Sequence, residues 1–156
     1  MATDLSSLLK GGIITPCYEA TSRKQALHAL SEELSRVTNI SAREIEDSVM
    51  ERERLGSTGV GEGVAIPHAR VQGIDAPIGG FMRLASGVDF EAIDDRPCDL
   101  IFMLLAPLSA GADHLRALAQ VSRVFRQGAV RDALRGANTV EEVKAIICKE
   151  AVESSI

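Results

Sequence analysis

The sequence has no excess of basic residues, the feature on which nucleic-acid binding depends most. Its 17 lysines and arginines are outnumbered by 22 aspartates and glutamates, the net charge is −5, and the basic residues are scattered along the chain. Nucleic-acid backbones are bound through clustered lysines and arginines, because their phosphates are negatively charged. We therefore expect no nucleic-acid partner.

The chain is also poor in cysteine. Cys17, Cys98 and Cys148 are odd in number, widely separated and never in a CxxC pair, so they predict neither a disulfide framework nor a zinc ribbon. Such thiols are typical of a reducing compartment, and we expect a cytoplasmic protein. A zinc site built from Cys98, His68 and His114 is disfavoured, because their spacing matches neither HExxH nor paired CxxC motifs. We expect no metal and no cofactor.

Long hydrophobic runs are missing as well. The longest, residues 100–107, is far too short to span a bilayer, so we expect no direct membrane insertion. The opening MATDLSSLLK has an aspartate where a secretory signal would be basic, which indicates that no targeting signal is present. There is no internal repeat, low-complexity tract or dividing linker, so we expect residues 1–156 to form a single domain.

Capping and periodicity predict helices at both ends of the chain and a sheet between them. Three capping boxes mark helix starts: Ser22 with Gln25, Ser41 with Glu44, and Thr139 with Glu142. The helical faces read from the spacing are Leu27, Leu30 and Leu34; Ile45 and Val49; Leu115, Leu118, Ser122 and Phe125; and Val143, Ile146 and Ile147. The second helix is expected to end just before Gly56.

Between these helices, residues 64–66 and 78–84 read as short strands. The uninterrupted apolar run DLIFMLLAP, residues 99–107, is typical of a central strand that is covered on both faces. The pattern predicts an α/β sandwich.

The glycine-rich stretch GSTGVGEGVAIPHAR, residues 56–70, is the main candidate for a functional site. Its glycines do not follow the GxGxxG spacing, no lysine follows them, and the next element is a predicted strand, so a phosphate-cradling loop is disfavoured. The GSTG tetrapeptide also fails to match the GxSxG nucleophile elbow. A turn with glycines at positive φ accounts for part of the pattern.

His68 is the reactive candidate in this stretch. Pro67 fixes its own φ, biases Ile66 toward an extended conformation and removes an N–H, so we expect the strand to end there with the imidazole near its tip. A neutral imidazole has one nitrogen free to attack while the other holds the proton. The residues alone leave open the alternative of a histidine that merely packs at a strand end.

Two further residues gain interest if His68 is reactive. His114 begins a predicted helix, where backbone N–H groups favour an anion, and Arg52 near the end of the second helix could offer a planar guanidinium to phosphate oxygens. Each could instead be an ordinary surface residue. His28, on the polar shoulder of the first helix, is interpreted as structural or solvent-facing.

Three sequence blocks together resemble a known family. RERLGSTGVGEGVAIPHAR, then GVDFEAIDDRPCDLIFMLLAP, then HLRALAQVSRVFR are similar to the enzyme IIA domain of the mannitol/fructose type in the bacterial phosphoenolpyruvate:sugar phosphotransferase system, and most similar to its nitrogen-regulatory form. The resemblance extends from about Leu5 to the last helix. It implies a mixed sheet of about five strands with helices on both faces, in agreement with the element order.

The resemblance also implies a function and a set of site residues. His68 would accept a phosphoryl group from a histidine-containing phosphocarrier protein, Arg52 and His114 would flank the phosphate, and Ser57 and Thr58 would belong to the site wall. The implied protein is a stoichiometric phosphotransferase that regulates protein targets, such as sensor kinases or ion transporters, according to its phosphorylation state.

Two alternatives remain open. A sugar-transport enzyme IIA would pass phosphate to a separate IIB, and a pure binding module would keep the fold without phosphorylation. The sequence departs from the family pattern at Glu62, where Asn or Thr is usual, and at Ala69, where Gly is usual. Glu62 places a carboxylate near the phosphate acceptor, so either its side chain points away or it disfavours transfer.

Overall fold

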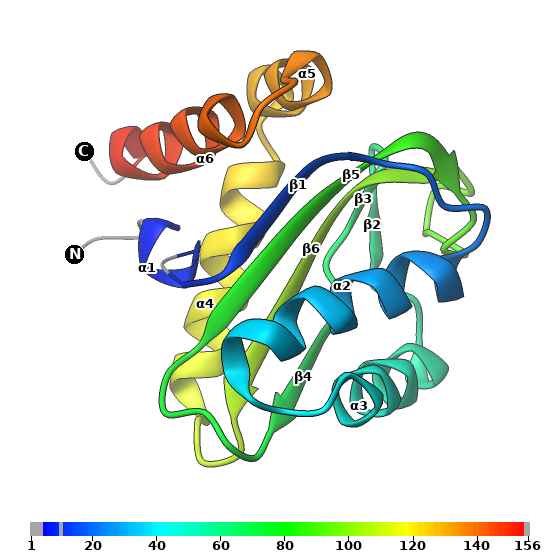
Figure 1. Cartoon of the computed structure of the whole chain (residues 1–156). Helices are drawn as coiled ribbons and strands as arrows, with labels where there is room; N and C mark the ends of the chain where they lie inside the picture. The colour runs from blue at the N-terminus through cyan, green and yellow to red at the C-terminus, as the bar shows by residue number, and fades with distance from the viewer. Residues whose placement is uncertain (1–4, 10, 155–156) are drawn as a thin grey trace.

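A computed structural model describes residues 5–9 and 11–154, which form a mixed sheet with helices on both of its faces (Figure 1). The strands are β1 (Ile13–Tyr18), β2 (Gly59–Gly61), β3 (Val64–Ala65), β4 (His68–Val71), β5 (Ile78–Val88) and β6 (Cys98–Pro107). The helices are α1 (Ser6–Leu9), α2 (Arg23–Thr38), α3 (Ala42–Leu55), α4 (Ala112–Phe125), α5 (Gly128–Gly136) and α6 (Val140–Ser154). The predicted fold class is confirmed, with six strands in place of about five.

The sheet is organised around β6. Its order is β1-β5-β6-β3-β2, and β4 pairs with β6 beside β3. β5 runs antiparallel to β6, whereas β3 and β4 both run parallel to it, with Val64 opposite Leu100 and His68 opposite Leu104. β3 and β4 therefore pair with successive parts of the same edge of β6, and His68 is the first residue of β4.

Helices α2 and α3 cover one face of the sheet, and α1, α4, α5 and α6 lie on the other (Figure 1). The predicted caps are confirmed: the hydroxyls of Ser22, Ser41 and Thr139 accept the N–H groups of the residues three positions later. These helix starts could be predicted because a capping box is a local interaction.

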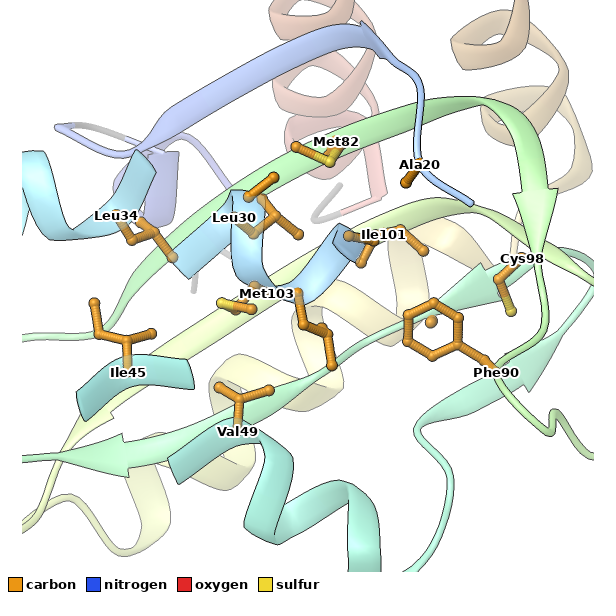
Figure 2. Close-up of a cluster of buried hydrophobic side chains, with 14 of the residues drawn as sticks. Ala20, Leu30, Leu34, Ile45, Val49, Met82, Phe90, Cys98, Ile101 and Met103 are labelled. Atoms are coloured by element: carbon orange, nitrogen blue, oxygen red, sulfur yellow. The ribbon is translucent and has the colours of Figure 1, made fainter. Parts of the chain in front are cut away.

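The hydrophobic core has two halves separated by the sheet. Figure 2 shows the half beneath α2 and α3, where Leu30 and Val49 approach Ile101 and Met103 of β6. Phe102 of β6 packs in the other half. The central strand is thus buried on both faces, as its uninterrupted apolar sequence predicted.

Two of the sequence expectations need correction. The buried face of α4 is formed by Ala117, Val121, Val124 and Phe125, while Leu115 is 68% exposed. The apolar residues of α4 occupy more than one side of the helix, so spacing alone did not identify the side that faces the core.

The second correction concerns the strands. The strand ends before Pro67, as predicted, because β3 stops at Ala65, but His68 then begins a second strand, β4, instead of lying only near the tip of the first. The carbonyl of Pro67 still accepts the N–H of Leu104, so the edge of β6 stays paired between β3 and β4. β1, β2, β4, α1 and α5 were not predicted from the sequence.

Candidate functional site

The candidate site is a depression lined by residues of α3, of β4 and around the start of α4. β4 lies beside α3 in the fold (Figure 1). The volume of the depression is about 660 Å³. The lining residues are Ser48, Glu51, Arg52 and Leu55 of α3; His68, Ala69 and Arg70 of β4; and Leu108, Gly111, His114 and Leu115 around the start of α4. The structure therefore brings together Arg52, His68 and His114, which are far apart in the sequence.

His68 is half-buried, and one of its ring nitrogens is fixed. Nδ1 lies 2.8 Å from the carbonyl oxygen of Ile66. Because a carbonyl can only accept, Nδ1 carries the hydrogen and donates it, which leaves the lone pair of the neutral ring on Nε2. Burial lowers the pKa of His68 below its ordinary 6.5, and the charge of Arg52 acts in the same direction. The ring is therefore held neutral, with one nitrogen available as a nucleophile.

His114 lies in the first turn of α4, and its ring centroid is 5.5 Å from that of His68. Burial lowers the pKa of His114, with smaller contributions from His68 and Arg70. Gly111 provides no side chain to cap the helix, so the first N–H groups of α4 keep their capacity to bind an anion. This end of the depression favours negative charge.

Arg52 is in the last turn of α3, and its Nη1 donates to the carbonyl oxygen of Gly56 at 2.8 Å. That bond orients the guanidinium at the site. Arg52 and His68 also line a second, smaller depression of about 220 Å³, together with Ser57, Thr58 and Leu118. The two predicted wall residues are thus placed next to His68.

The hydroxyls of Ser57 and Thr58 are both engaged in hydrogen bonds. Ser57 Oγ donates to the carbonyl oxygen of Phe90 and accepts the N–H of Gly59 at 3.0 Å. Thr58 is buried, and its hydroxyl donates to the carboxylate of Glu53. These hydrogen bonds hold the segment between α3 and β2 in place.

Glu53 and Arg23 were missed by the sequence reasoning. The Glu53 side chain is 1% exposed and lies 3.3 Å from Nη1 of Arg23, which also donates to the carbonyl of Phe90 at 3.4 Å. A buried carboxylate is costly unless it is paired and hydrogen-bonded, and here Arg23 and Thr58 satisfy both conditions. The sequence does contain a signal for the burial of Glu53, because this residue continues the four-residue spacing of Ile45 and Val49 on the buried face of α3.

Glu62, the departure from the family pattern, points away from His68. It adopts φ 58° in the turn between β2 and β3, and its carboxylate forms ion pairs at 3.5 Å with Arg96 and with Arg131. It lines a separate opening, beside Phe125. Its negative charge is directed away from the His68 depression.

The remaining candidates lie elsewhere. His28 is exposed on α2, with Nδ1 2.7 Å from Glu46 of α3 and Nε2 3.4 Å from Glu32. Cys98 is buried in the core, where its thiol donates to the carbonyl of Val64.

Within residues 5–9 and 11–154, no group of three or more His, Cys, Asp or Glu side chains is arranged to hold a metal ion. No helix in that part of the chain is both long and apolar enough to cross a membrane.

Comparisons with known proteins agree on one family. Residues 7–150 match the family described as "Phosphoenolpyruvate-dependent sugar phosphotransferase system, EIIA 2". A nitrogen regulatory protein of Bradyrhizobium diazoefficiens is 37% identical over 143 residues, which cover 92% of this chain and 94% of that protein. A fructose-specific EIIA component of Haloferax volcanii is 41% identical over 107 residues, 69% of each chain.

The crystal structure of nitrogen regulatory protein IIA-Ntr from Neisseria meningitidis matches with a TM-score of 0.84 and 35% identity, covering 92% of this chain and 98% of that one. Sequence and fold therefore lead to the same conclusion. The chain belongs to the EIIA 2 family of the phosphoenolpyruvate-dependent sugar phosphotransferase system, whose members are phosphotransfer carriers.

Proposed function

We propose that this protein is a phosphoryl carrier of the nitrogen-related phosphotransferase system and that His68 Nε2 accepts the phosphoryl group. The donor is a histidine-containing phosphocarrier protein. The observation that carries the proposal is the hydrogen bond from His68 Nδ1 to the carbonyl of Ile66, since it leaves Nε2 unprotonated in a depression that also contains Arg52 and His114. The cysteines are few, odd in number and widely separated in the sequence, which supports a reducing, cytoplasmic location.

The transfer is a displacement at phosphorus between two imidazoles. The bond from the donor nitrogen to phosphorus breaks, its electron pair stays on the donor ring, and the lone pair of His68 Nε2 forms the new bond. If each ring keeps the proton on its other nitrogen, PO₃⁻ moves with no net proton transfer. In the loose transition state negative charge spreads over the equatorial oxygens, so catalysis consists of positioning and electrostatic stabilisation.

Arg52 and His114 provide that stabilisation. Arg52 offers a planar guanidinium whose position is fixed by its bond to Gly56. His114 lies in the first turn of α4, where the backbone N–H groups also favour negative charge. Neutral His68 is a better nucleophile than its protonated form, so the lowered pKa also favours transfer at neutral pH.

An apolar rim around the depression is suited to receive the donor protein. Leu55, Leu108 and Leu115 line the depression and are 82%, 58% and 68% exposed. Apolar side chains gathered around a site commonly mark an interface. Replacing Leu115 with serine is expected to raise the KM for the phosphocarrier, whereas Val37→Ser, at an exposed position on α2, leaves it unchanged. The measurement is the initial rate of transfer at several donor concentrations.

Phosphorylation would change how the protein binds its regulatory targets. The modification adds about −1.5 to −2 charges at the rim, where a partner surface would have to be desolvated. The phosphorylated and the unphosphorylated protein therefore bind such a target with different affinities. Equal affinity of a target for both states would contradict this part of the proposal.

Intact-mass spectrometry tests the carrier function directly. The protein is incubated with phosphoenolpyruvate, enzyme I and the phosphocarrier, alongside His68→Ala and the control His28→Ala. We expect one acid-labile phosphoryl group on the parent and on His28→Ala, and none on His68→Ala. No addition to the parent, when the donor is demonstrably phosphorylated, would refute the proposal in favour of a pure binding module.

A sugar-transport role is the second candidate, because one relative is a fructose-specific EIIA component. The two roles differ in the fate of the phosphoryl group. Adding a fructose-type IIB to the phosphorylated protein would discharge it rapidly if it serves transport. A phosphoryl group that stays on His68 in the presence of that IIB supports the regulatory role.

A further inference from the structure

Arg70 shares the face of β4 that carries His68. Along this strand Ala69 and Val71 are buried in the core beneath α2 and α3, while His68 and Arg70 alternate with them and line the depression. Residues two apart on a strand are separated by about 7 Å, at about 3.3 Å per residue, and their side chains point to the same side. The long side chain of arginine spans that separation.

Arg70 is also an unengaged cation. It is exposed, and among the side chains that the structure describes it has no hydrogen-bond or ion-pair partner. In contrast, Nη1 of Arg52 donates to Gly56, and Arg131 and Arg135 are engaged with carboxylates and backbone carbonyls. The charge of Arg70 reaches His114, which it helps keep neutral. Arg70 thus lies at the site with all its donors available.

We propose, on the basis of the proposed function, that the Arg70 guanidinium binds the phosphoryl oxygens on His68 Nε2 opposite Arg52. His68 would then lie between a guanidinium from α3 and one from its own strand, with His114 at the third side. A phosphoryl dianion has three acceptor oxygens, and a guanidinium has five donors in a planar fork. Two arginines satisfy these oxygens better than Arg52 alone, one of whose nitrogens is already bonded to the backbone.

The test compares Arg70→Gln with Arg70→Lys and Arg54→Gln. Arg54 is an exposed arginine of α3 that lines neither depression, so Arg54→Gln removes the same charge away from the site. Each protein is mixed with phosphorylated phosphocarrier, and the equilibrium distribution of the phosphoryl group is measured by intact mass. Arg70→Gln is expected to shift this equilibrium about fivefold toward the donor, which is a typical effect of losing one partly exposed contact between charged groups. Arg70→Lys recovers most of the loss, and Arg54→Gln changes it less than twofold.

Phosphorus NMR gives a second readout that docking does not affect. The charged and titratable groups around the phosphoryl group are Arg52, Glu51 and buried Glu53 of α3, Arg70 of β4 and His114 of α4. Loss of a nearby cation favours the protonated phosphoryl group, so its pKa rises in Arg70→Gln and not in Arg54→Gln. Circular dichroism spectra that match the parent show that the variants fold.

The outcomes separate this inference from the proposed function. A parent protein that accepts no phosphoryl group refutes both. A parent that accepts it, with Arg70→Gln matching Arg54→Gln in equilibrium and in phosphoryl pKa, refutes only the role of Arg70. Slower transfer by Arg70→Gln with an unchanged equilibrium shows that Arg70 acts only in the complex with the donor or in the transition state, and it also overturns the proposal, because an equilibrium between free proteins depends on neither.

Discussion

Replacing Glu53 with alanine is expected to lower the free energy of unfolding by about 3 kcal/mol, because it leaves buried donors without an acceptor. The carboxylate accepts the hydroxyl and the N–H of Thr58 and pairs with Nη1 of Arg23. All three interactions are lost in the variant. The loop that carries Ser57 and Thr58 loses its attachment to α3 at the same time.

The expected loss of unfolding free energy depends on which partners and how much solvent exposure each donor keeps in the variant. A buried donor left without a partner costs about 1–3 kcal/mol, and breaking a buried ion pair costs about 3–5 kcal/mol. The Arg23 side chain is 24% exposed and keeps its bond to the carbonyl of Phe90, so its share lies below the buried-pair range. The glutamine variant keeps the size and the carbonyl acceptor, and about 1–2 kcal/mol is expected for it.

Urea unfolding followed by circular dichroism is the appropriate assay, since the chain has no tryptophan and one tyrosine. Glu91→Gln is a matched control: its carboxylate approaches the same Arg23, at 4.0 Å, but is 74% exposed. We expect a change of at most about 0.5 kcal/mol in that control. In thermal unfolding the Glu53→Ala variant should have a Tm about 6–12 °C lower than the parent. Equal stability of Glu53→Ala and Glu91→Gln would refute the reasoning.

Two further predictions concern protonation and backbone geometry. NMR titration of the three histidines should give pKa values below 6.5 for His68 and His114, because burial disfavours their charged forms, and above 6.5 for His28, which bonds to Glu46. The lowered pKa values contribute stability above pH 6.5 that is lost as pH falls, whereas His28 contributes at lower pH and loses its contribution as pH rises. Gly63→Ala should cost about 1–3 kcal/mol in urea unfolding, since φ is +80° and the new Cβ would lie 2.4 Å from an Arg135 nitrogen. Gly136→Ala, where a Cβ meets open space, is the control, and equal effects of the two would contradict the prediction.

Features set by local interactions could be predicted from the sequence, and those that depend on tertiary contacts could not. The capping boxes at Ser22, Ser41 and Thr139 involve residues three positions apart, so the sequence alone specifies them. β4 is only four residues long and derives its strand conformation from pairing with β6. No pattern within four residues reveals a partner more than thirty positions away, so its existence depended on the fold.

For the candidate site too, the sequence indicates the individual residues, whereas their proximity depends on tertiary contacts. Pro67 and the glycine run single out His68 in the sequence, the predicted helix ends draw attention to Arg52 and His114, and the family resemblance implies that these two residues flank the phosphate. Their proximity was not predictable from their spacing, because it requires α3, β4 and α4 to meet at one edge of the sheet. The exposed side of α4 was misread for a related reason: Leu115 belongs to the rim of the depression and not to the core.

The charges around His68 explain how one site can suit both chemical states of the histidine. Before transfer, burial and the charge of Arg52 keep the ring neutral, and after transfer the same cation stabilises the phosphoryl group in the proposed reaction. The negative charge of Glu53 opposes both effects, yet its carboxylate is already paired with Arg23 and Thr58, which limits its influence. Glu62 is directed to arginines outside the depression. Glu53 and Glu62 are therefore neutralised within the fold, whereas the guanidinium groups of Arg52 and Arg70 line the depression that contains His68.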